Sequence, residues 1–282
     1  MTDNPSTFSV RFWGVRGSIP TPGPETVGVG GNTSCLEVRC GDRLVIFDGG
    51  TGLRALGSLL MKNLPVKASM FFSHVHWDHI QGFPFFVPAF MPGNRFDIYG
   101  GKNLSSTLAE TLHGQMNFPN FPVTLDQMAA TMVFHQFEDG QHVELGDDLK
   151  VKGLLLNHPG GSYGYRMEYN GKVLVYCTDT EHRENPDAHV LELARNADLL
   201  IYDAQYTPEE YAGQEDGIPK KGWGHSTFVE AARLAELAGA SRVILFHHDP
   251  TQDDDAVAEK ERRCRELFPK SDAAREGTVI EL

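Results

Sequence analysis

A histidine-rich hexapeptide constrains this chain more than any other feature. Residues 74–79 read His-Val-His-Trp-Asp-His, so three imidazoles and one carboxylate lie within six positions. Such polar groups are costly to bury together unless a cation shares their lone pairs. His74 and His76 are two residues apart and project to one side of an extended segment. Asp78 and His79 follow after a bend and can face a second ion. Because an apolar run precedes the motif, we predict a buried strand that ends in a metal site rather than a polar surface turn.

Three more candidate ligands each end an apolar run that is typical of a strand. They are His158, Asp179 and His247. A single histidine or aspartate at the end of a strand more often caps a turn than binds a metal. Together with the hexapeptide, however, these three residues form a set of imidazole and carboxylate ligands that zinc accepts. His248 follows His247 directly. Because adjacent residues of a strand point in opposite directions, we predict that only His247 is a ligand and that His248 lies either near the substrate or behind the ligands.

The hexapeptide resembles the signature of the metallo-β-lactamase superfamily of metallohydrolases, and the later ligands follow in the same order. The resemblance implies an α/β fold, the four-layer αββα sandwich, and two divalent ions. Zinc is the first expectation, and manganese or iron are the alternatives. Residue by residue, the implied ligands are His74, His76 and His158 for one ion, Asp78, His79 and His247 for the other, and Asp179 between them. The resemblance also implies hydrolysis by water that the ions activate, with Asp78 orienting this water.

Composition and charge narrow the class of protein. The 282 residues fit one large α/β domain spanning 1–282, in which the polar residues 1–7 are expected to be frayed. The four cysteines have no metal or disulfide spacing, no apolar run approaches the roughly 20 residues that cross a bilayer, and the N-terminus has no signal-peptide pattern. We therefore expect a soluble, cytoplasmic protein with no membrane partner. The formal charge of −13 disfavours a long nucleic acid partner.

Periodicity predicts strands in two groups with helices between them. Strands are expected at 9–13, 34–40, 43–47, 68–72, 172–177, 198–202, 242–247 and 277–282, and helices at 53–61, 104–112, 187–196, 227–237 and 255–268. The segment 82–140 is rich in Phe, Pro and Met, and most of its elements are hard to assign. Pattern alone supports a mixed α/β protein, and the sandwich comes from the resemblance.

One further motif bears on the substrate. Residues 224–227 read Gly-His-Ser-Thr and precede a predicted helix, whose N-terminus attracts phosphate. This motif is similar to one in the tRNA 3′-end endonucleases and cyclic-nucleotide phosphodiesterases of the superfamily. The resemblance implies that His225 protonates the leaving oxygen or binds the phosphate; the alternative is that it only packs or caps. Other candidate substrate contacts, each also compatible with a purely structural role, are Asn32, Tyr163, Asp203 and His248.

Two departures from the tRNA endonucleases decide the predicted substrate. Residues 202–206 read Tyr-Asp-Ala-Gln-Tyr in place of a Glu-Ala-Thr-like box, although Asp203 could still orient His225. Between 140 and 200 the sequence contains no Gly- and Lys-rich insertion of the kind that grips tRNA. We therefore predict a phosphodiesterase for a small substrate such as a cyclic nucleotide. The alternatives are a tRNase Z-like ribonuclease, a lactonase or β-lactamase, and a metal-binding sensor without hydrolytic activity. A homodimer is compatible with each.

Overall fold

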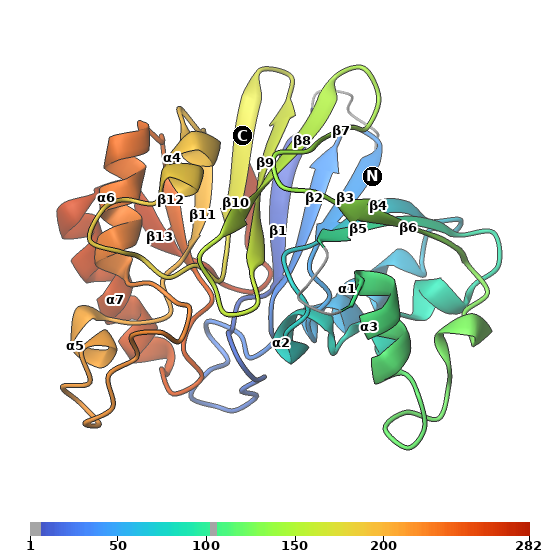
Figure 1. The fold of residues 1–282 in the computed structure, drawn as a ribbon, viewed down its shortest axis with the longest axis horizontal. Coiled ribbons are helices and arrows are strands. Elements are labelled where there is room, and N and C mark those ends of the chain that lie inside the picture. Colours follow the sequence, from blue (N-terminus) through green and yellow to red (C-terminus); the bar gives the residue numbers. More distant parts are fainter. Residues whose placement is uncertain (1–6, 102–105) are drawn as a thin grey trace.

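The computed structural model describes residues 7–101 and 106–282, which form two seven-stranded sheets that face each other (Figure 1). The first sheet has the order β14 (Val279–Glu281), β1 (Phe8–Gly14), β2 (Cys35–Cys40), β3 (Arg43–Phe47), β4 (Lys67–Phe72), β5 (Arg95–Gly101) and β6 (Thr131–Phe137). The second has the order β13 (Ser271–Ala273), β12 (Val243–Phe246), β11 (Leu199–Asp203), β10 (Lys172–Cys177), β9 (Ser162–Tyr169), β8 (Leu149–Leu156) and β7 (His142–Glu144).

Helices cover the outer face of each sheet (Figure 1). On the first sheet these are α1 (Gly52–Leu60) and α3 (Leu108–Gln115), and on the second they are α4 (Ala188–Ala194), α6 (Phe228–Ala238) and α7 (Asp254–Leu267). Short α2 (Trp77–Ile80) and α5 (Pro208–Tyr211) lie in connecting segments, as do 3-10 turns at Phe83–Phe85, Val87–Phe90 and Leu125–Gln127. The predicted four-layer αββα sandwich is confirmed. None of the helices in the described part of the chain is long and apolar enough to span a bilayer.

The continuous apolar run of β3 is explained by burial on both faces of its sheet. Val45 and Phe47 belong to the cluster between the two sheets, whereas Leu44 and Ile46 belong to the cluster under α1 and α3. Successive side chains of a strand point to opposite faces, so a strand covered on both sides must be apolar at every position. The sandwich therefore has an inner core between the sheets and an outer core beneath the helices of each sheet.

Helix α6 packs closely on the second sheet because its buried face is rich in alanine, with Ala231 and Ala235 fully buried. Thr227 is its N-cap and accepts a hydrogen bond from the Glu230 backbone N–H. Gly239 ends the helix in the left-handed conformation, with φ of 67°. The predicted helix at 227–237 is thus displaced by a single residue.

The segment 82–140 contains β5 and β6, which the pattern did not predict; outside it, β7, β9, β13 and the first part of β8 are also additions to the predicted strands. Helix α3 begins at Leu108 because Thr107 and Glu110 form a capping box at its start; the predicted start at residue 104 lies outside the described residues. Strand β6 is at the edge of its sheet, and most of its residues are only partly buried. Its sequence therefore lacks the regular alternation that marks a half-buried strand.

Several strands end at one edge of the molecule. Strands β3 and β4 are parallel, as are β10, β11 and β12, and β8 runs in the direction of β10 because both are antiparallel to β9. The loops that follow these strands carry the candidate ligands. In α/β sheets, the crevice outside the carboxyl ends of the strands is the usual place for a ligand.

Candidate metal centre

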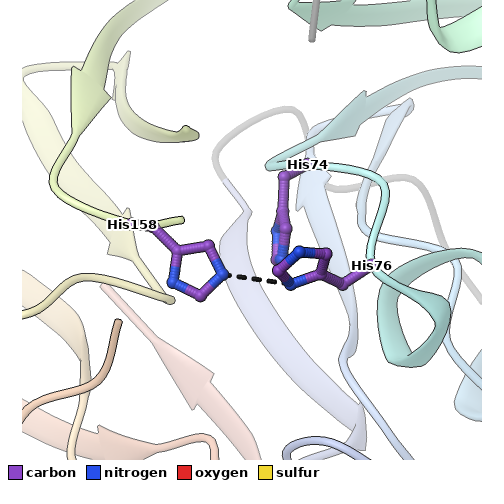
Figure 2. A group of neighbouring side chains, drawn as sticks. All are labelled: His74, His76 and His158. Carbon is purple, nitrogen blue, oxygen red and sulfur yellow. Dashed lines mark hydrogen bonds between the residues drawn. The ribbon is translucent and has the colours of Figure 1, made fainter. Parts of the chain in front are cut away.

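Three histidines from two sheets meet in the first ligand group (Figure 2). His74 and His76 follow β4, and His158 follows β8. His158 Nε2 approaches His76 Nδ1 to 3.1 Å, and the His74 ring centroid lies 4.4 Å from that of His76 and 4.8 Å from that of His158. One nitrogen of each ring lies within 4.8 Å of the others, which is the arrangement of a three-histidine metal site.

Four buried side chains converge in a second group formed by Asp78, His79, Asp179 and His247. The Nε2 atoms of His79 and His247 are 3.3 Å apart. Asp78 Oδ2 lies 3.2 Å from His79 Nε2 and 3.1 Å from His247 Nε2. Two imidazole nitrogens and two carboxylates thus face one point, as ligands of a divalent ion do.

Asp179 lies between the two groups and offers one oxygen to each. Its Oδ1 atom is 3.6 Å from His74 Nε2 and 3.9 Å from His158 Nε2. Its Oδ2 atom is 3.2 Å from His79 Nε2 and 3.3 Å from His247 Nε2. This is the placement that a bridging carboxylate requires.

The donor set fits divalent cations. His74 is 4% exposed, and its Nε2 atom is buried without a hydrogen-bond partner. A buried unpaired ring nitrogen is destabilising, and a cation is a partner that removes this penalty. Burial holds the pKa of His74 well below its usual value, so the ring is in the neutral form that binds metals. At His79, burial lowers the pKa but Asp179, Asp78 and Asp48 together raise it well above its usual value. The same carboxylates would stabilise a metal cation.

Two residues that the sequence did not point out hold the candidate ligand histidines in place. Asp48 Oδ2 accepts a hydrogen bond from His79 Nδ1 at 2.9 Å, and Gln205 Oε1 accepts one from His247 Nδ1 at 2.9 Å. Each bond places the ring proton on Nδ1 and leaves the Nε2 lone pair for a metal. Asp48 also accepts hydrogen bonds from Ser73 and from the Tyr176 hydroxyl. Asp48 and Gln205 have side chains of common types, and only the fold reveals their role.

Replacing Gln205 by leucine is expected to weaken metal binding about 10- to 100-fold, because His247 Nδ1–H would lose its acceptor in a buried site. Competition titration with a chelator measures the affinity. Gln214→Leu, at an exposed position, is the matched control and should bind metal like the parent. Equal affinity in both variants would show that Gln205 does not orient the ligand.

Three residues of the centre adopt the left-handed backbone conformation directly after a strand or close to its end. The φ angles are 60° for Asp48, 53° for Asp179 and 61° for His247. Non-glycine residues rarely adopt this conformation, and it tends to occur at functional sites. These turns accompany the placement of Asp179 and His247 in the second ligand group and of Asp48 against His79.

Two glycines allow the backbone to approach the ligand histidines. A Cβ atom at Gly17 would lie 2.4 Å from the His247 ring, and one at Gly224 would lie 2.2 Å from the His158 ring. The Gly224 carbonyl also accepts a hydrogen bond from His158 Nδ1 at 2.8 Å. The glycine of the Gly-His-Ser-Thr motif therefore has a role of its own in fixing a ligand.

His225 stands beside both ligand groups. Its ring centroid is 5.2 Å from that of His158 and 4.9 Å from that of His247. Its Nδ1 atom donates to Asp203 Oδ2 at 2.8 Å. Burial lowers the pKa of His225, but Asp203 and the neighbouring carboxylates outweigh it and raise that pKa to about 9. Asp203 is itself buried and accepts hydrogen bonds from the backbone N–H groups of Gln205 and Ser226.

The other candidate substrate residues make structural contacts away from this cluster. Asn32 Nδ2 donates to Glu276, and the Tyr163 ring packs against Phe137. His248 is fully buried, and its Nε2 donates to the Ala274 carbonyl at 3.0 Å. A substrate role for Asn32, Tyr163 or His248 stays a prediction.

A cavity of about 440 Å³ opens over the ligands. Its lining includes Ser18, Trp77 and His225 together with Asp78 and Asp179. The Ser18 backbone N–H donates to Asp78 Oδ2 at 2.7 Å, which fixes this carboxylate toward the cavity. A substrate can therefore reach the candidate metal positions and His225 from the same opening.

The sequence profile of the β-lactamase superfamily domain matches residues 43–248. The chain belongs to this superfamily. Among curated proteins it is similar to Ribonuclease Z of Gemmatimonas aurantiaca, with 25% identity over 97% of this chain and 95% of the relative. Among solved structures it resembles the metallo-β-lactamase fold protein YhfI of Bacillus subtilis, with 21% identity, a TM-score of 0.73, and coverage of 98% of this chain and 100% of the other. The short form of human tRNase Z gives 22% identity, a TM-score of 0.65, and coverage of 96% and 98%.

The metallo-β-lactamase resemblance inferred from the hexapeptide is thus confirmed, and so is its placement near the tRNase Z branch. As a member of this superfamily the protein is a hydrolase, and its cluster of histidines and aspartates suits divalent metal ions.

Proposed function

We propose that this superfamily member is a phosphodiesterase that uses two divalent ions, with zinc as the first expectation. The observation that carries the proposal is the His225–Asp203 pair beside two ligand groups that share Asp179. Two ions bound there would polarise a phosphoryl oxygen and lower the pKa of a bound water. The set of His74, His76, His158, Asp78, His79, His247 and Asp179 would hold them.

The protein's own residues supply the rest of the reaction. Asp78, which lines the cavity and is held by the Ser18 N–H, orients the attacking water. His225 donates a proton from Nε2 to the leaving oxygen, and Asp203 stabilises the protonated ring and fixes its orientation through Nδ1. A general acid is most useful when the leaving oxygen is an alkoxide, as in a nucleic acid or a cyclic nucleotide.

RNA is the substrate that the relatives favour. Ribonuclease Z proteins match this chain over 85% to 99% of their own length, and they support the ribonuclease alternative better than a cyclic-nucleotide phosphodiesterase. The ligand groups and the His225–Asp203 pair are compatible with both substrates, since both contain a phosphodiester with an alkoxide leaving group.

A small phosphodiester is the second candidate, because the protein's net negative charge repels a long polyanion such as RNA. The formal charge is −13, and the segment 140–200, where the sequence lacks a Gly- and Lys-rich insertion, folds into β7 to β10 and α4. Each phosphate contact with a long nucleic acid normally needs lysine or arginine.

Hydrolysis assays with the zinc- or manganese-loaded protein distinguish the two candidates. The substrates are an RNA hairpin with a single-stranded 3′ extension and 2′,3′-cyclic and 3′,5′-cyclic nucleotides. Endonucleolytic cleavage of the RNA supports the ribonuclease, and turnover of cyclic nucleotides alone supports the small-substrate enzyme. Failure to hydrolyse any of them, or bis(p-nitrophenyl) phosphate, contradicts the phosphodiesterase proposal.

A further inference from the structure

A second, larger cavity of about 800 Å³ adjoins the cavity over the ligands. The two cavities share Ser18 and His225, so a phosphodiester bound at the ligands with its leaving oxygen near His225 extends one substituent into the larger space. The side chains that shape this space are Tyr206, Glu210, Glu215, Asp216, Trp223 and Asp249.

The walls of the larger cavity carry excess negative charge. Four carboxylates line it against two cationic groups, Lys220 and the His225 ring, and the His225 ring is already hydrogen-bonded to the buried Asp203. Lys220 pairs with Asp216 at 2.5 Å and lies 4.9 Å over the Trp223 ring, so its charge is already matched. Lys260 lies behind the wall, 1% exposed, and donates to the Ala204 carbonyl.

Two of the other carboxylates, Glu210 and Asp249, are held by neutral donors. Glu210 accepts hydrogen bonds from the Thr207 N–H and from Gln252 Nε2. Asp249 accepts hydrogen bonds from the Thr251 N–H and from Gln205 Nε2. Neutral donors fix the orientation of a carboxylate without cancelling its charge, so the cavity keeps a negative potential.

Trp223 supplies an apolar surface in the same space. Its ring is 50% exposed, although Lys220 lies over it. A flat substituent such as a nucleobase can stack on an exposed aromatic ring, and its amino groups can donate to the surrounding carboxylates.

We propose that this acidic cavity selects the substituent on one side of the scissile phosphate: it accepts a neutral or cationic group, such as a terminal nucleoside, and rejects a group that bears a further phosphate. This proposal rests on the proposed phosphodiesterase activity. The physical reason is that a second phosphate would lie among like charges close to Glu215 and Asp249, and like charges at an interface strongly disfavour the wrong partner. The cavity thereby limits the substrate on that side to a chain end.

Dinucleotide hydrolysis by the zinc-loaded full chain tests the proposal. The substrates are adenylyl-(3′→5′)-adenosine and the same compound with an added 5′-phosphate or an added 3′-phosphate, and bis(p-nitrophenyl) phosphate is the reference. For one of the two phosphorylated dinucleotides we expect kcat/KM to fall by about tenfold or more relative to the unmodified compound. Glu215→Lys should bring the ratio of kcat/KM for the unmodified and the phosphorylated dinucleotide closer to one. Glu236→Lys changes net charge equally at an exposed position of α6 and should leave the ratio as it is in the parent.

Three results would overturn the proposal. One is equal cleavage of all three dinucleotides, and the second is a ratio that Glu215→Lys leaves unchanged. The third is turnover of bis(p-nitrophenyl) phosphate without cleavage of the unmodified dinucleotide. If neither compound is hydrolysed, the phosphodiesterase proposal fails together with the selectivity that depends on it.

Discussion

His225→Ala is expected to lower the hydrolysis of a dinucleotide by about 10²- to 10⁴-fold, the range of a positioned general acid. The leaving group of this substrate is an alkoxide, which needs a proton, and His225 is the residue that Asp203 holds in position to donate it. Bis(p-nitrophenyl) phosphate should be affected less, because its leaving group is stable without protonation. Steady-state kinetics with both substrates measure the difference.

Metal content must be measured in the same variant, because His225 Nδ1 lies 3.9 Å from Asp179. We expect the variant to keep the metal content of the parent. His142→Ala, at an exposed position of β7, is the control and should retain parental kinetics. An equal loss on both substrates would contradict the role of His225 as proton donor, and loss of metal would make it a ligand.

Asp179→Asn is expected to lower the metal content and to lower turnover by more than about 100-fold. Replacing a residue that only holds a metal ligand in place already costs about 10- to 100-fold in metal affinity or activity, and Asp179 is itself a proposed ligand. Asp179 gives one oxygen to each ligand group, so a neutral amide removes a negative charge from both positions. Elemental analysis after gel filtration gives the metal per chain, and hydrolysis of bis(p-nitrophenyl) phosphate gives the activity.

Asp97→Asn is the control for the loss of a carboxylate, since Asp97 pairs with Arg95 and His135 on β5 and β6. It should bind metal and turn over substrate like the parent. If Asp179→Asn kept a full complement of metal, Asp179 would not bridge the two groups.

The sequence was most informative where function requires uncommon residues close together. The hexapeptide is rich in candidate ligands, and the later candidates each stand directly after a strand or near its end. The resemblance to the superfamily therefore predicted that these residues meet at one site. Helix α6 was predictable because its buried face repeats with the helical period and Thr227 caps it.

Other features could not be read from the sequence because they depend on contacts between distant elements. Gln205 is one of many polar residues until the fold brings it to 2.9 Å from His247 Nδ1. Gly17 and Gly224 are distinguished from other glycines only by the candidate ligand histidines, His247 and His158, packed against them. The acidic cavity is formed by residues between 18 and 251, and no local pattern predicts it.

The substrate marks the limit of inference from sequence. Net charge pointed to a small phosphodiester, whereas the curated relatives are named ribonucleases. Net charge describes the whole surface, and a substrate responds to the charges near its own phosphates. The acidic cavity reconciles the two views in part, because it would restrict one side of the substrate to a chain end even if the other side is RNA.

The two-metal phosphodiesterase can be tested by a zinc titration of the metal-free protein, with hydrolysis of bis(p-nitrophenyl) phosphate measured at each step. We expect turnover to rise as zinc is added and to reach its plateau at two ions per chain. Two bound ions without turnover would contradict the phosphodiesterase, and a plateau at one ion per chain would contradict the two-metal centre.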